Sequence, residues 1–152
     1  MPERPDFIRH WSELEGPDDS HYPGDEELMS IGAPIARLLG LIRIGIHHER
    51  LPPGRRTSYP HAESAEEEFV YVLQGEVVLR SDGGEQLLSA GMCAGFPAGS
   101  SDGHQLINRS AAPAVYLEVS NRDGDDCVYY SDPDVDLMYV GNKAFRRDGT
   151  PC

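Results

Sequence analysis

The sequence predicts an all-β protein in which short strands form a sandwich or a barrel. Segments rich in β-branched and aromatic residues recur at a spacing of roughly 8–12 residues, and each is bounded by Gly, Pro, Asn or Asp. No long segment shows the apolar period of an amphipathic helix. The chain has 152 residues, which suits one domain with a sizeable core.

The expected strands begin at residue 41 and follow one another closely. Residues 41–46 form the first, and the turn sequence Pro52-Pro53-Gly54 stops it. Residues 68–73 have the strongest strand pattern, and 76–80 follow. The sequence Asp82-Gly83-Gly84 indicates a hairpin, because tight hairpin turns need positive φ angles. Further strands are expected at 85–89, 92–96, 104–108 and 114–119.

The polar, turn-rich ends divide the chain into three parts. We expect an N-terminal arm at residues 1–40, a barrel core at 41–120 and a C-terminal extension at 121–152. Within the arm, Trp11 and Leu14 lie about one helical turn apart and can pack a short helix onto the body. In the extension, residues 137–140 and 143–145 predict either a hairpin or an arm that packs on a neighbouring subunit.

Composition argues against several classes of protein. The formal net charge of −13 repels phosphate backbones and anionic lipid, so nucleic acid is not expected as a partner. No apolar run approaches the roughly 20 residues of a membrane span, and the first residues do not resemble a secretory signal. Three cysteines cannot all pair within the chain, and we expect reduced thiols in a cytoplasmic protein.

A few polar side chains fall on strand faces that otherwise point toward a core. His61 and Glu63 are two residues apart and can converge on one point. Glu68 shares its face with two valines, and His104 shares its face with a leucine. A buried carboxylate is costly unless a cation or hydrogen-bond donors satisfy it. These residues are therefore candidates for a metal or ligand site.

Other polar residues are less informative. His47 and His48 are adjacent in the sequence, so on a strand they face opposite ways and cannot both serve one site; we interpret them as structural. Ser64 lies near His61 in the sequence, but nothing arranges the two as a nucleophile and its base. No glycine-rich phosphate loop is present.

The spacing of two segments resembles the two motifs of the cupin superfamily. In the first motif His61, Glu68 and Gly75 fit, whereas Gly54 lies one residue too early and Glu63 replaces the second histidine. The second motif is matched by Gly91, Pro97, Gly99, His104 and Asn108, with four residues instead of two between Gly99 and His104. The resemblance covers about residues 40–120, and it is closest to small, mostly uncharacterised bacterial cupins.

The resemblance implies a double-stranded β-helix, or jelly-roll, barrel with one divalent metal ion inside. Carried over position by position, the metal ligands are His61, Glu63, Glu68 and His104. Histidine and carboxylate ligands together suit Zn, Mn, Fe or Ni. The resemblance also implies a homodimer, and the strand at 68–73, apolar on both faces, favours a dimer joined by sheet packing. The resemblance implies no substrate, but a barrel mouth lined by apolar strand residues suits a small-molecule ligand.

Three functions remain open from the sequence. The chain is a metal-dependent enzyme such as an oxygenase, isomerase or lyase, in which the metal is the Lewis acid and Glu63 or a bound water is the base. Alternatively it is a non-catalytic module that holds a sugar or organic acid and has an altered or empty metal site. A structural subunit with a vestigial site is the third possibility. The fold alone does not choose among them.

Overall fold

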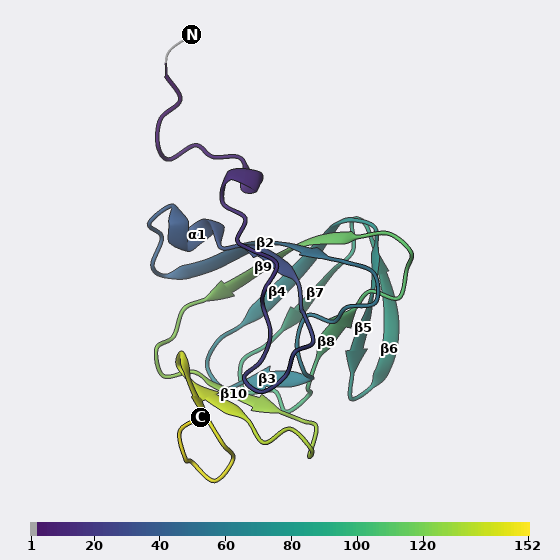
Figure 1. The fold of residues 1–152 in the computed structure, drawn as a ribbon. Helices are drawn as coiled ribbons and strands as arrows, with labels where there is room; N and C mark the ends of the chain where they lie inside the picture. Colours follow the sequence, from purple (N-terminus) through teal and green to yellow (C-terminus); the bar gives the residue numbers. More distant parts are fainter. Residues whose placement is uncertain (1–2) are drawn as a thin grey trace.

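A computed structural model describes residues 3–152 and is built almost entirely from β-strands (Figure 1). The helical elements are a 3₁₀ turn, η1 (Trp11–Glu13), and a single-turn helix, α1 (Ile35–Leu38). The strands are β1 (Ile31–Ala33), β2 (Ile44–Leu51), β3 (His61–Glu63), β4 (Glu68–Gln74), β5 (Glu76–Ser81), β6 (Gly84–Ser89), β7 (Cys93–Phe96), β8 (Gln105–Ile107), β9 (Ala114–Asn121), β10 (Cys127–Tyr130), β11 (Met138–Val140) and β12 (Lys143–Phe145). The predicted all-β jelly-roll barrel is confirmed.

Three antiparallel sheets enclose the barrel interior. The largest has the order β1-β2-β9-β4-β7, and the second pairs β6, β5 and β8 in that order. The third has the order β12-β11-β10-β3 and lies at the lower end of the barrel in Figure 1. Strands far apart in sequence pair at the centre of the main sheet, where β9 lies between β2 and β4. This crossover pattern brings residues near 45, 68 and 120 into one row.

The strand predicted at residues 41–46 lies further along the chain, and a short strand, β1, precedes it at Ile31–Ala33. We expected it at residues 41–46, whereas β2 spans Ile44–Leu51. The amide of Leu41 still bonds back to the carbonyl of Ala36, and Gly40 adopts a positive φ of 80°, so the chain is turning at this point. Pro52 does end the strand. The polar run of residues 47–50 concealed the second half of β2, because charged side chains are rarely read as strand interior.

Two predicted hairpins are confirmed. The strands β5 and β6 pair through a tight turn that ends at Gly84, whose φ of 118° is a conformation that favours glycine. In the C-terminal extension β11 and β12 form the hairpin that was one of the two options, and they add to β10 at the edge of the third sheet. The extension therefore folds back onto the chain that carries it.

The inward face of the barrel changes character along β4. Val70 and Val72 are buried with the apolar core residues Leu51, Val77, Leu88, Leu106, Ala114 and Tyr116. The first residue of the same face is Glu68, which pairs in register with Ser120. Apolar packing thus closes one half of the barrel, and the half where β4 begins is polar.

The outward face of β4 remains about two-fifths exposed in the single chain. Phe69, Tyr71 and Leu73 are 39%, 38% and 43% exposed. We expected this face to be covered by a packed sheet or by a dimer partner, and no strand within residues 3–152 covers it fully. The homodimer stays a prediction. None of the described helices is long enough to cross a membrane.

The N-terminal segment is held to the barrel by one aromatic stack and several ion pairs. Trp11 stacks on His48 at 4.2 Å between ring centroids, which agrees with the predicted short helix packed on the body. Arg50 makes two hydrogen bonds, of 2.6 and 2.7 Å, to Glu15. Further pairs join Arg55 to Asp18, and Arg56 to Asp25 and Glu27. Charge therefore ties this acidic segment to the rim formed by residues 50–56.

The Arg50→Gln substitution is expected to loosen this segment. Trp11 is the only tryptophan, so its fluorescence reports the docking directly. We expect a red shift of its emission and a loss of about 1 kcal/mol in the free energy of unfolding, because the Glu15 carboxylate loses a partly buried partner. The Arg109→Gln variant, which breaks a more exposed Arg–Glu pair elsewhere, is the control and should leave the emission unchanged. Equal emission spectra in wild type and Arg50→Gln would contradict this docking.

Candidate metal centre

Two backbone contacts place His61 and His104 side by side. His61 opens β3, and His104 directly precedes β8. The two residues form an isolated antiparallel bridge with reciprocal N–H···O bonds of 3.1 and 2.9 Å. Directly opposed residues in an antiparallel pair project to the same side. Their rings accordingly lie 4.5 Å apart between centroids.

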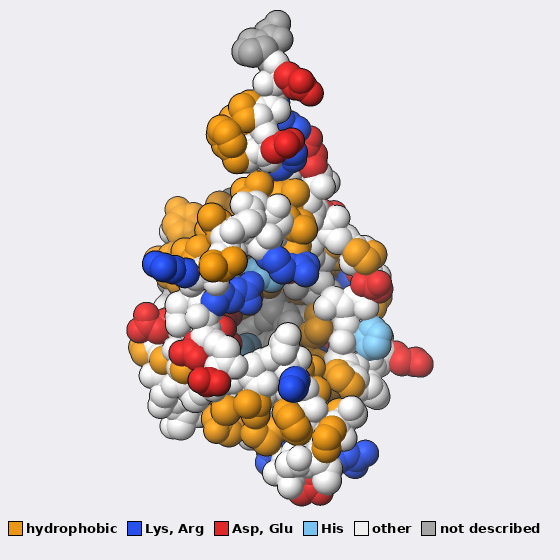
Figure 2. Space-filling view, turned by 90° about the vertical axis from the view of Figure 1, so that its left-hand side faces the viewer, with side chains coloured by type: hydrophobic (Ala, Val, Ile, Leu, Met, Phe, Trp, Pro, Cys, Tyr) orange, Lys and Arg blue, Asp and Glu red, His pale blue; other side chains and the backbone are white. Residues whose placement is uncertain are grey.

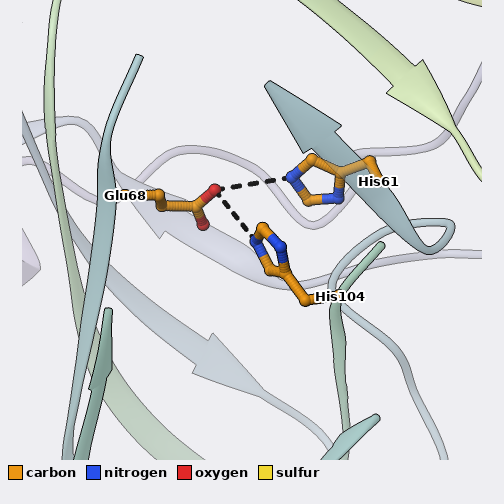
Figure 3. Close-up of side chains that lie close together, drawn as sticks. All are labelled: His61, Glu68 and His104. Atoms are coloured by element: carbon orange, nitrogen blue, oxygen red, sulfur yellow. Dashed lines mark hydrogen bonds and ion pairs between the residues drawn. The ribbon is translucent and has the colours of Figure 1, made fainter. Parts of the chain in front are cut away.

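Both histidines point at one oxygen of a buried carboxylate (Figure 3). The Nε2 atom of His61 is 3.4 Å from Oε2 of Glu68, and Nε2 of His104 is 3.3 Å from the same oxygen. Phe96 stacks flat against His104 at 3.6 Å and fixes the plane of that ring. Glu68 and His104 are buried. One ligand atom from each of the three residues lies within 4.8 Å of the others, as a shared ion requires.

The hydrogen bonds of His61 test whether a cation fits there. Its Nδ1 lies 3.1 Å from the carbonyl oxygen of Tyr59 and 3.0 Å from the hydroxyl of Ser58. A carbonyl can only accept, so Nδ1 carries the proton and the neutral ring has a bare lone pair at Nε2. That lone pair faces a carboxylate oxygen, an arrangement that a cation satisfies. Backbone and hydroxyl partners at the far nitrogen are the usual support of a metal-bound histidine.

The protonation of the centre shows the same requirement for positive charge. Burial alone raises the pKa of Glu68, but the hydrogen bonds and charges of His104 and His61 outweigh it and hold that pKa below the usual carboxyl range. Burial lowers the pKa of His61, and the contact with Glu68 outweighs burial and raises it. Glu68 is therefore ionised, and its negative charge requires either a protonated histidine or a bound metal ion beside it. Two histidines and one carboxylate are the donor set of the facial triad that binds Fe(II) and similar ions.

Glu63, the fourth predicted ligand, lies beside this cluster. Its Oε1 is 3.8 Å from Nε2 of His61, but its carboxylate groups with Glu66 and Asp126 rather than with His104. Burial, and then the nearby charge of Glu68, raises its pKa to about 8. The structure thus brings three of the four predicted residues to one point and leaves Glu63 next to it.

The barrel interior holds further charged residues: His47, which the sequence led us to interpret as structural, and Glu49 and Glu118, which the sequence analysis did not single out. His47 and Glu118 are paired in register across β2 and β9, and Val70 lies opposite Glu118 on β4, so both side chains share the inward face. Glu49 is buried on the same face. His48 points the other way and packs under Trp11, as expected for adjacent strand residues. Glu118 carried the same signal as Glu68, a carboxylate within an apolar strand, and this signal was overlooked.

A pocket opens at the end of the main sheet where β2 and β4 begin and β7 and β9 end. Its volume is about 530 Å³, and it is lined by Glu68 and Ser120 together with Ile44, Phe69 and Val119 of the outward face. A smaller cavity of about 100 Å³ lies against Glu63 and His104. Figure 2 shows a hollow on this side of the molecule with basic side chains at its rim. The smaller cavity is the one that contacts His104 of the candidate centre.

Comparisons with known proteins agree with the motifs. Residues 47–120 match the model of the cupin domain. A sugar phosphate isomerase of the cupin superfamily from Silicibacter pomeroyi is 37% identical, with 81% of this chain and 80% of that protein covered and a TM-score of 0.74. The chain belongs to the cupin superfamily. No curated protein matches it.

Two further solved structures resemble this cupin over most of its length. A protein from Acidithiobacillus ferrooxidans that is proposed to be a sugar phosphate isomerase is 26% identical, with coverage of 76% of this chain and 74% of that protein and a TM-score of 0.70. A Thermus thermophilus protein is 30% identical, with coverage of 76% and 96% and a TM-score of 0.55. The cupin fold is therefore shown by sequence and by structure.

The Glu118→Gln substitution is expected to stabilise the metal-free cupin as pH rises. Burial, and then the charges of Glu68 and Glu49, raise the pKa of Glu118 well above 4.5. Above that pH the folded protein keeps a proton that the unfolded chain releases, so this residue makes stability fall with rising pH. Glutamine has no ionisable proton, so the variant lacks this loss of stability.

Urea unfolding in the presence of a chelator measures the effect. Between about pH 5 and about pH 8, the free energy of unfolding of the variant should rise relative to that of wild type by about 1 kcal/mol or more. The exposed Glu76→Gln on β5 is the control and should track wild type. A difference between Glu118→Gln and wild type that does not grow with pH would show that Glu118 ionises normally.

Proposed function

We propose that this cupin is a divalent-metal-dependent isomerase of a small hydroxy-carbonyl compound of the sugar type. The observation that carries the proposal is the convergence of His61, Glu68 and His104 on one point inside an accessible barrel. The isomerase class is supported by the Silicibacter pomeroyi protein, which aligns over four-fifths of both chains. Fold similarity by itself would support no single reaction.

His61, Glu68 and His104 would hold the ion and leave coordination positions open toward the pocket. Three protein ligands are the usual number in catalytic metal sites, because the remaining positions bind water or substrate. When bound, the ion would act as a Lewis acid that polarises the substrate carbonyl. Ser58 and the Tyr59 carbonyl would keep Nε2 of His61 aimed at it.

Glu63 is suited to move the proton. It stands next to His61 without joining the three-residue cluster, and it lines the small cavity that also contacts His104. Isomerisation of a hydroxy-carbonyl compound moves one proton from the carbon beside the carbonyl to the carbonyl carbon, while the hydroxyl proton passes to the former carbonyl oxygen. Atoms and electrons balance without an external oxidant or reductant. One carboxylate can accept and return the carbon-bound proton.

Deuterium exchange tests the proposal without knowledge of the exact substrate. A panel of aldoses, ketoses and their phosphates is incubated with the metal-loaded cupin in D₂O, and NMR follows deuterium at the carbon beside the carbonyl. We expect exchange with at least one compound, and loss of that exchange after chelation. Glu63→Gln should reduce the rate by about 100-fold or more, since an acid–base group typically contributes that much.

The control is Glu76→Gln, an exposed carboxylate on β5, which should retain the exchange. Metal-dependent binding of a sugar without exchange would contradict the isomerase proposal and would favour the non-catalytic binding module.

A further inference from the structure

We infer that Tyr22, at the tip of a loop in the N-terminal segment, is a positioning residue of the metal centre. It holds Tyr59, whose carbonyl oxygen accepts the Nδ1 proton of His61, and thereby keeps Nε2 of His61 aimed at Glu68. This inference rests on the metal centre of the proposed function and is independent of the reaction carried out there. It gives the N-terminal segment a role in metal binding.

The tip of the loop is a tight turn that the sequence preforms. Residues 16–32 form a loop that a backbone hydrogen bond of 2.9 Å closes between its two ends, and the loop runs down the barrel to β3 (Figure 1). At the tip, the amide of Asp25 donates to the carbonyl of Tyr22 at 3.1 Å. Between them lie Pro23 and Gly24, and Gly24 has a φ of 77°. Proline followed by a glycine at positive φ is typical of a type II turn, which here presents Tyr22 and Asp25 together.

This turn holds Tyr59 by its backbone, its ring and its hydroxyl. The amide of Tyr59 donates to the Tyr22 hydroxyl oxygen at 3.2 Å, and its own hydroxyl donates to the carboxylate of Asp25. The rings of Tyr22 and Tyr59 stack at 4.2 Å between centroids, with 13° between their planes. The guanidinium carbon of Arg56 lies 4.3 Å from the centre of the Tyr59 ring, and Arg56 is itself paired with Asp25. Tyr59 therefore has little freedom to move.

The backbone of Tyr59 transmits this restraint to His61. Pro60 follows Tyr59 and restricts its backbone to extended conformations. Because Tyr22 also binds the amide, the direction of the Tyr59 carbonyl is set, and that carbonyl lies 3.1 Å from Nδ1 of His61. A hydrogen bond at the far nitrogen fixes the tautomer and the ring orientation of a metal-binding histidine.

The part of the chain that carries Tyr59 depends on such contacts. Residues 57–60 lie between strands and not within one. The carbonyl of Ser58 accepts from the side chain of Gln105 at 2.8 Å, and the amide of Tyr59 has its partner in Tyr22. Side chains from two other segments therefore hold the residues that support His61.

A second contact of Tyr22 reaches the centre through the third sheet. Tyr130 is buried and pairs in register with His61 across β10 and β3, with 6.3 Å between the two ring centroids. Tyr22 and Tyr59 each meet the Tyr130 ring edge to face, at 5.5 and 5.8 Å between centroids, which is a favoured geometry for aromatic pairs. The three tyrosines form one cluster beside His61, and Tyr22 is the member that the N-terminal segment contributes.

Binding of cobalt(II) to chelator-treated protein tests this role without a measurement of activity, because the visible absorption of the ion reports both affinity and ligand geometry. We expect Tyr22→Ala to weaken cobalt binding by about tenfold or more, since loss of an outer partner of a ligand typically costs about 10–100-fold in metal affinity. Tyr22→Phe keeps the stacked ring and removes only the hydroxyl, so its affinity should fall between those of wild type and Tyr22→Ala.

The matched control is Tyr129→Ala, which removes a tyrosine of β10 that is 53% exposed. It should bind cobalt as wild type does. A Tyr22 side chain that served stability alone would leave the absorption spectrum of the loaded protein unchanged, whereas we expect the bands of loaded Tyr22→Ala to change in position or intensity. Circular dichroism checks that each variant is folded, and Tyr22→Phe keeps the test valid if Tyr22→Ala does not fold.

The outcomes separate this inference from the proposed reaction. Equal cobalt affinity and equal spectra in wild type and in each folded Tyr22 variant would overturn the inference, even if deuterium exchange is observed. Weaker binding by the Tyr22 variants, in a protein that catalyses no exchange, would support the inference and count against the isomerase proposal. A wild type that binds no cobalt would overturn the metal centre and this inference with it.

Discussion

The structure depends on one buried carboxylate oxygen, Oε2 of Glu68, which faces the Nε2 atoms of two histidines. An ionised carboxylate in a protein interior is costly unless it is paired, and removal of a single partner typically costs about 3–5 kcal/mol. The backbone bridge between His61 and His104 and the stacking of Phe96 hold these partners in place. Nδ1 of His61 donates its proton to the Tyr59 carbonyl, so Nε2 of the neutral ring has no proton to donate to Glu68. A metal ion bound to both Nε2 and the Glu68 carboxylate would satisfy this geometry.

The rest of the barrel supports this centre by dividing its interior. Along β4 the inward face passes from Glu68 to Val70 and Val72, so that one half is packed with apolar side chains and the other is open. The packed half gives the rigidity that holds the three side chains of the candidate centre, which come from separate segments, together. The polar half carries Glu63 and Glu118 near this centre, and a small cavity lies against Glu63 and His104.

The sequence predicted the centre because its residues violate the apolar pattern locally. Glu68, His61 and His104 could each be recognised from i, i+2 alternation and from motif spacing. The second half of β2 could not, because the polar run at 47–50 belongs to a strand whose inward face is itself charged. Arg122 and His47 are 75 residues apart, and only the register of β2 with β9 brings them together. Pairing between distant strands is the information that local patterns lack.

Metal content tests the central claim most directly. The cupin is purified without added metal or chelator, incubated in separate portions with zinc, manganese, iron(II) and nickel, desalted and analysed by elemental mass spectrometry. The account predicts about one ion per chain for at least one of these metals, lost in His61→Ala/His104→Ala and retained in the control His10→Ala/His21→Ala, which changes two exposed histidines. Absence of bound metal in the parent, or equal content in both double variants, would contradict it.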